Sequence, residues 1–147
     1  MIALDGMEGF EVGRMRLASA RQALADFSAL HGAAGTALRD WVERNFRSRG
    51  TLIEGMPSGW PALAPATLAA RRRRGLGAQP LEATGRLRRG IALRTEQRAA
   101  VLTNAVPYAG LHQFGAGVPR RPFFPEAPQA AAIVGPVVTR HVEEALR

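Results

Sequence analysis

The chain has 147 residues, a length typical of one domain, and 46% of them are hydrophobic, which suffices for one modest core. All 20 basic residues are arginine and the formal net charge is +8, so a Walker-type phosphate lysine and a Schiff-base lysine are both excluded. Cysteine is absent, which excludes disulfides, cysteine-ligated metals and thiol nucleophiles. We therefore expect a single domain over residues 1–147, with a loop at 49–65 and an arm at 115–125.

We expect no export signal at the start of the chain. Residues 1–13 lack a basic beginning and a long apolar run, and no segment approaches the roughly 20 apolar residues of a membrane span. The sequence therefore predicts a soluble protein that is initially cytoplasmic and has no membrane partner. Because residues 1–13 are acidic and rich in glycine, we expect either an edge strand or a loosely held lead-in there.

Helical spacing of apolar residues begins after this lead-in. Leu17, Ala20 and Leu24, and later Leu38 and Trp41, recur at intervals that place them on one apolar face. Gly32 and Gly35 interrupt the pattern, so we expect two consecutive helices or one bent helix, the second covering about 33–46.

The composition then changes to a loop that is rich in proline and glycine. Three prolines and three glycines within 49–65 exclude a continuous helix or a central strand. Trp60 lies inside this loop, and its large apolar surface favours a loop that folds back and is pinned. A short basic helix is expected over 67–74, ended by Gly75 and Gly77.

Two short alternating runs follow, Ile91 to Thr95 and Ala99 to Thr103, and they predict a β-hairpin that turns near residues 96–98. Pro107 then fits the entry to a short helix, and Gly115 fits its exit. Tyr108, Leu111 and His112 would share one face of this helix.

Beyond that helix, Pro119 and Pro122 favour an extended arm. Residues 125–128 read as a turn, and Gly135-Pro136 should break or kink the last helix, leaving 136–146 as its surest part. The whole pattern predicts an α+β fold, in which N-terminal helices pack on a small antiparallel β-sheet, with long loops, the proline-stiffened arm and a C-terminal helix.

Candidate chemistry is sparse. The three histidines are far apart and show no metal-ligand spacing, so we expect no metal site and no cofactor. Tyr108 and His112, four residues apart, could form an acid/base pair, but no carboxylate or nucleophile motif lies nearby in the sequence. A buried His112 that is hydrogen-bonded to a loop carbonyl is the preferred interpretation, and we expect no catalytic residues.

Basic residues cluster strongly, with nine of the 20 arginines within residues 71–98. Such a cluster can neutralise phosphates and release counterions, which makes it a candidate contact for DNA or another polyanion. The alternative is a solvated basic surface, because no aromatic residues are interleaved to stack bases. The candidate contact residues are Arg71, Arg72, Arg73, Arg74, Arg86, Arg88 and Arg89.

Four segments occur in an order typical of a known family. They are GWPALAPAT at 59–67, PLEATGRLRRGI at 80–91, VPYAGLHQFG at 106–115 and RPFF at 121–124. In these segments, about residues 38–125 resemble the phage virion morphogenesis family, which includes the Mu G-like and P2 S-like tail completion proteins.

The resemblance implies a non-enzymatic protein of a tailed phage or a prophage-derived particle, assembled in the host cytoplasm and located at the neck or tail top of the virion. It implies a ring of identical subunits, a hexamer by family likeness, that completes the tail and joins it to the head. The implied partners are further copies of this chain, the head-tail connector and tail tube proteins, and packaged DNA in the channel. An arginine-rich nucleic-acid-binding accessory protein is the alternative function.

Roles for individual residues follow from this resemblance. We expect Trp60, Leu63 and Pro65 to anchor the loop, and the basic region to face DNA or an acidic partner surface. A proline-stiffened arm loses little freedom on docking, so it is expected to contact a neighbouring subunit. The expected interface residues are Tyr108, His112, Gln113, Phe114, Arg121, Pro122, Phe123 and Phe124.

Overall fold

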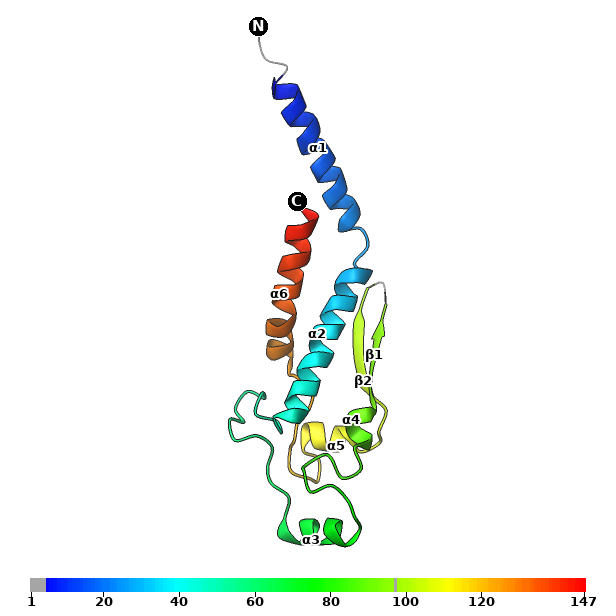
Figure 1. Ribbon diagram of the computed structural model, residues 1–147, viewed down its shortest axis with the longest axis vertical. Coiled ribbons are helices and arrows are strands. Elements are labelled where there is room, and N and C mark those ends of the chain that lie inside the picture. Colours follow the sequence, from blue (N-terminus) through cyan, green and yellow to red (C-terminus); the bar gives the residue numbers. More distant parts are fainter. Residues whose placement is uncertain (1–4, 97) are drawn as a thin grey trace.

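A computed structural model describes residues 5–96 and 98–147, with side chains described from Phe10 onward (Figure 1). It confirms the α+β class: the described chain is mainly helical with one two-stranded antiparallel sheet. In chain order the elements are α1 (Asp5–Ala23), α2 (Ser28–Arg47), α3 (Pro65–Arg73), α4 (Arg86–Arg89), β1 (Ile91–Thr95), β2 (Ala100–Asn104), α5 (Ala109–Phe114) and α6 (Ala127–Ala145).

The first two helices are separated, as expected, but at a different place. α1 already begins at Asp5, so residues 5–13 are helical rather than a strand or loose lead-in, and residues 1–4 lie outside the described part. The break falls at residues 24–27, where Asp26 Oδ1 accepts a hydrogen bond of 2.8 Å from the backbone N–H of Ser28. A carboxylate at this position satisfies one of the free N–H groups that begin α2. Gly32 and Gly35 therefore lie inside α2 and do not end it.

Gly35 has a packing role that explains its place within a helix. A Cβ atom on Gly35 would lie 2.7 Å from Leu93 Cδ1 and 3.0 Å from the Cβ of Ala100, so the absence of a side chain allows α2 to approach the hairpin. Glycine in place of alanine destabilises a helix by about 1 kcal/mol, and the close packing of α2 on the hairpin offsets this loss.

The predicted hairpin is present as β1 and β2, with Leu93 opposite Leu102 and Thr95 opposite Ala100. Directly opposed residues of an antiparallel pair point to the same face. Leu102, rather than Val101 or Thr103, therefore faces α2 together with Leu93, and Leu102 packs against the core. The sequence predicted that Ala99, Val101 and Thr103 share one face of the second strand. The residues that face α2 are instead Ala100 and Leu102, one position later, and β2 begins at Ala100.

The last helix is longer than expected. α6 runs without interruption from Ala127 to Ala145 and includes Pro136, so residues 125–128 are not simply a turn and Gly135-Pro136 does not end the helix. Proline removes one helical hydrogen bond at this point. Packing along α2, visible in Figure 1, offsets that loss, and Ile133 contacts the core from α6.

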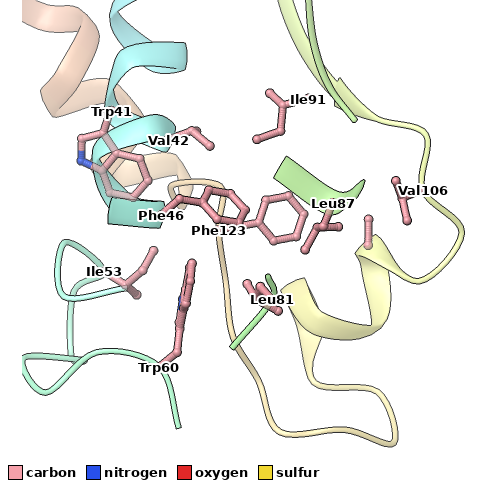
Figure 2. Packing of buried hydrophobic residues seen from close by; sticks show 11 residues of the cluster. Trp41, Val42, Phe46, Ile53, Trp60, Leu81, Leu87, Ile91, Val106 and Phe123 are labelled. Atoms are coloured by element: carbon pink, nitrogen blue, oxygen red, sulfur yellow. The ribbon is translucent and has the colours of Figure 1, made fainter. Parts of the chain in front are cut away.

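The core lies where the C-terminal end of α2 meets the loops, the hairpin base and α5. Phe46 and Phe123 are at its centre, surrounded by side chains from nearly every segment between α2 and the arm (Figure 2). The buried apolar residues of this cluster are Trp41, Val42, Phe46, Ile53, Trp60, Leu81, Leu87, Ile91, Val106, Ala109 and Phe123. α1 contributes nothing to this cluster and extends away from it (Figure 1).

Candidate functional site

The arm lies along the chain's own core. Phe123 is only 1% exposed, and its ring centroid is 5.9 Å from that of Phe46. Trp60 Nε1 donates a hydrogen bond of 2.7 Å to the carbonyl of Pro122. Asn45 Nδ2 lies 3.4 Å from the carbonyl oxygens of both Pro122 and Phe123. These contacts tie α2 and the tryptophan loop to the arm.

Gln113 holds the arm from the other side. Its Oε1 accepts hydrogen bonds from the backbone N–H groups of Phe123 and Phe124, at 3.0 and 3.1 Å, and its Nε2 donates to the Phe124 carbonyl at 3.2 Å. The backbone N–H of Arg121 also donates to the carbonyl of His112, at 2.8 Å. A glutamine amide thus supplies both the acceptor and the donor that an extended, unpaired backbone needs.

In the described chain the arm does not project, and its contact with a neighbouring subunit stays a prediction. Pro122 and Phe123 are fully buried and Arg121 is 5% exposed, so these side chains are occupied inside the fold. The physical reason is that burying a phenylalanine side chain in the adjacent apolar core removes its surface from water and so lowers the free energy of the folded chain. Of the predicted interface residues, Phe114 is 79% exposed and Tyr108 is also exposed. Their role at an interface stays a prediction.

The tryptophan loop is built around a close approach of backbone to ring. Trp60 packs edge-on against Phe46, with ring centroids 5.3 Å apart. Gly50, at φ 87°, faces the indole so closely that a Cβ would lie 2.3 Å from Trp60 Cδ1. Leu63 is half-buried beside this region, and Pro65 is an exposed residue that begins α3.

Some of the arginines proposed to contact DNA are engaged within the fold. Arg88 Nη2 and Nε donate to Glu43 Oε2 at 2.7 and 3.0 Å, and its Nη1 donates to Glu82 Oε1 at 3.2 Å. The hydrogen bond to Glu43 is the main cause that raises the pKa of Arg88. Arg71 Nη1 donates to two backbone carbonyls of the following loop, at 2.9 and 2.8 Å. Arg89 Nη2 donates to the backbone carbonyl of Thr84 at 2.9 Å.

The other four candidates, Arg72, Arg73, Arg74 and Arg86, are exposed. Within the described ranges, none of these four guanidinium groups forms a hydrogen bond or an ion pair. Arg72 and Arg73 end α3 and Arg74 follows it directly, and α3 lies at the end of the molecule opposite to α1 (Figure 1). The basic region therefore divides into arginines that stabilise the fold and arginines that remain available to an anion.

His112 has no loop carbonyl as a partner, contrary to the preferred interpretation. Its Nδ1 is buried and has no hydrogen-bond partner among the described residues, while its ring packs edge-on against Tyr108 at 6.1 Å between centroids. Burial lowers the pKa of His112, and the positive charges of Arg121 and Arg71 lower it further. A neutral imidazole beside two guanidinium groups is therefore the favoured state.

The sequence did not reveal an exposed apolar surface on α1. Phe10 and Leu17 of α1 are each 71% exposed, although the sequence placed Leu17 on the apolar face of a helix. They are seven residues apart and so lie on the same face of the helix. Val142 and Leu146 near the end of α6 are exposed as well. Helical periodicity located the apolar face, but it could not reveal that the described part of the chain covers Ala20 and leaves Phe10 and Leu17 exposed.

No group of three histidine, aspartate or glutamate side chains within 5–96 and 98–147 is arranged to hold a metal ion. In the same part of the chain, no helix has both the length and the apolar character needed to cross a membrane.

A small α+β protein that leaves a long helix outside its core, with large apolar side chains exposed, has the features of a structural protein that completes its packing in an assembly. The phage virion morphogenesis family matches residues 11–141, and the chain belongs to this family. No curated protein and no solved structure matches the chain significantly. The protein is thus a structural component used in assembling phage particles, and its family is not known for enzymatic activity.

Proposed function

We propose that the protein completes the phage tail and joins it to the head, as a ring of identical subunits at the neck. The observation that carries the proposal is the surface of α1, where Phe10 and Leu17 are exposed on one face of a helix that its own chain barely covers. Most of a helix's stability in a protein comes from packing of its apolar face, so a partner for this face would stabilise α1.

The stabilisation available from covering this face can be estimated from the side chains that it would bury. Burying an exposed phenylalanine or leucine contributes roughly 1.5 to 3 kcal/mol, so Phe10 and Leu17 together would contribute about 3 to 6 kcal/mol per subunit before the entropy of association is deducted. A contact between unlike surfaces of successive copies closes into a ring when the rotation between them permits. The connector and tail tube would then contact the two faces of that ring.

The test is the oligomeric state of the purified protein, measured by size-exclusion chromatography with light scattering. Leu17→Glu should convert a ring into smaller species, because it places a charge in the apolar contact. Ser19→Glu is the matched control: it adds the same charge two residues away on the opposite side of α1 and should leave the ring intact. A wild-type chain that stays monomeric at high concentration, and particles that show no ring of this protein at the neck by electron microscopy, would refute the proposal.

A second candidate function, contact with nucleic acid, is favoured by the three exposed and unpaired arginines at the end of α3, Arg72, Arg73 and Arg74. They would contact packaged DNA if this end of the chain lined the channel of the ring. Replacing all three by glutamine should weaken DNA binding and flatten its salt dependence, since the slope of log K against log salt scales with the phosphates neutralised. Equal binding and an equal slope in wild type and variant would exclude these residues as the contact.

A further inference from the structure

A cavity of about 410 Å³ lies between the tryptophan loop, α3, α5 and the arm. Its polar side chains are those of Arg71, His112 and Arg121, together with the hydroxyl of Thr67, and none of its lining residues is acidic. Three nitrogen-bearing groups thus meet in one recess without a carboxylate to balance them. Leu63, Leu81 and Val118 are among the apolar residues that form the rest of the wall.

Both arginines are held in place by backbone carbonyls and retain free donors. Arg121 Nε donates to the carbonyl of Pro61 at 2.8 Å, and its Nη2 donates to that of Ala62 at 3.0 Å. Arg71 is held through Nη1 alone. Among the described residues, Nη1 of Arg121 and both Nε and Nη2 of Arg71 have no partner. Guanidinium groups fixed in this way lose little freedom when they bind an anion.

The cavity carries an excess of positive charge, which shows in the pKa values of its side chains. Burial lowers the pKa of Arg121, and the charge of Arg71 lowers it further. The same two arginines disfavour a proton on His112, whose buried Nδ1 is left without a partner. Glu82, the acidic residue next to Leu81, is paired with Arg88 instead. A buried charge without a counterion is costly, so an anion entering this recess would remove a penalty that the free chain carries.

We propose that this cavity is a receptor for a carboxylate side chain, presented by a neighbouring protein chain in the assembled particle. The inference rests on the proposed function, because it assumes such a neighbour. Two spaced guanidinium groups suit a planar carboxylate, and the apolar wall suits the methylene groups that carry it. A DNA phosphate would instead meet the exposed arginines at the end of α3, since Arg121 is only 5% exposed.

The first test places a carboxylate in the cavity from within the chain. Thr67 is an exposed residue of α3 that lines the recess, so Thr67→Glu should supply the missing anion, and Thr67→Gln is the neutral control of the same shape. We expect Thr67→Glu to raise the pKa of His112 by about 1 relative to Thr67→Gln, measured by NMR titration of its imidazole, because a nearby opposite charge favours the protonated form. An unchanged pKa would overturn the proposal.

The second test uses free probes on the wild-type chain. N-acetylglutamate amide should shift the imidazole signals of His112 in a saturable way, N-acetylglutamine amide should not, and Thr67→Glu should abolish the response. Inorganic phosphate binding in place of the carboxylate, or an equal effect of chloride, would overturn the preference for a carboxylate.

Particle assembly separates this inference from the proposed function. If the cavity receives a neighbour's side chain, Thr67→Glu should reduce the yield of complete particles at least tenfold while Thr67→Gln should not. Normal yields with Thr67→Glu would refute the receptor role and leave the ring proposal standing. A wild-type protein that binds the carboxylate probe but forms no ring would refute the proposed function and leave the anion site standing.

Discussion

Phe123 gives the sharpest test of where the arm lies. In this structure its ring fills the centre of the chain's own core, 5.9 Å from Phe46 and 4.7 Å from Phe124 between centroids. Replacing a buried phenylalanine by alanine lowers the free energy of unfolding by about 3 to 5 kcal/mol. The loss has two parts, the apolar area no longer buried and the cavity left behind. Since domains of this size are stable by about 5 to 15 kcal/mol, Phe123→Ala should leave the protein marginally folded. Phe114→Ala, at a side chain that is 79% exposed, should change stability by less than about 0.5 kcal/mol.

Urea denaturation followed by tryptophan fluorescence measures this difference, because Trp41 and Trp60 both belong to the core cluster. Wild type and variants must be compared at one protein concentration, since self-association adds to apparent stability. A lowered midpoint with an unchanged slope would indicate a loss of stability alone. If Phe123→Ala unfolded within about 1 kcal/mol of wild type, while Phe114→Ala was strongly destabilised, the assignment of Phe123 to the core would be refuted.

Three further predictions concern the tryptophan loop, the histidine and the glutamine clamp. Gly50→Ala should destabilise the chain by clearly more than Gly55→Ala. Both glycines have positive φ, where alanine costs on the order of 1 to 3 kcal/mol, but only at Gly50 would the new Cβ also collide with Trp60. An equal decrease in Tm for the two variants would show that the contact with the Trp60 indole does not contribute. The pKa of His112 is lowered in the fold, so the unfolded chain binds that proton more tightly, and stability should fall as pH drops below the ordinary value of 6.5. Between pH 7.5 and 5.5 the decrease in the free energy of unfolding should be smaller in His112→Gln than in wild type; an equal decrease would contradict this reasoning. Gln113→Ala leaves two arm N–H groups and one carbonyl without their side-chain partner, which should lower the free energy of unfolding by about 1 to 3 kcal/mol. Hydrogen exchange of the arm N–H groups should become faster. Unchanged exchange would count against the role of Gln113 in holding the arm.

Local signals in the sequence were sufficient for several elements. Pro107 and Gly115 bracketed the short helix α5, and Gly115 does adopt the left-handed conformation that ends it. The alternating runs located the hairpin, and the proline-rich stretch located the loop between α2 and α3. These features depend on the φ preferences of proline and glycine and on strand periodicity, which act over a few residues and need no knowledge of the rest of the chain.

The tertiary structure decided which surfaces are covered, because burial depends on segments far apart in the sequence. The pattern Arg-Pro-Phe-Phe identified an extended segment, but only the open core beside Phe46 determined that Phe123 would fill it. Leu17 belongs to an apolar stripe like any core residue, yet it is 71% exposed, because α1 lies outside the core cluster. Arg71 and Arg121 are 50 residues apart in sequence, and only the fold brings them to the wall of one cavity. Sequence alone thus determined the local conformation, whereas the fold decided which side chains remain available for assembly.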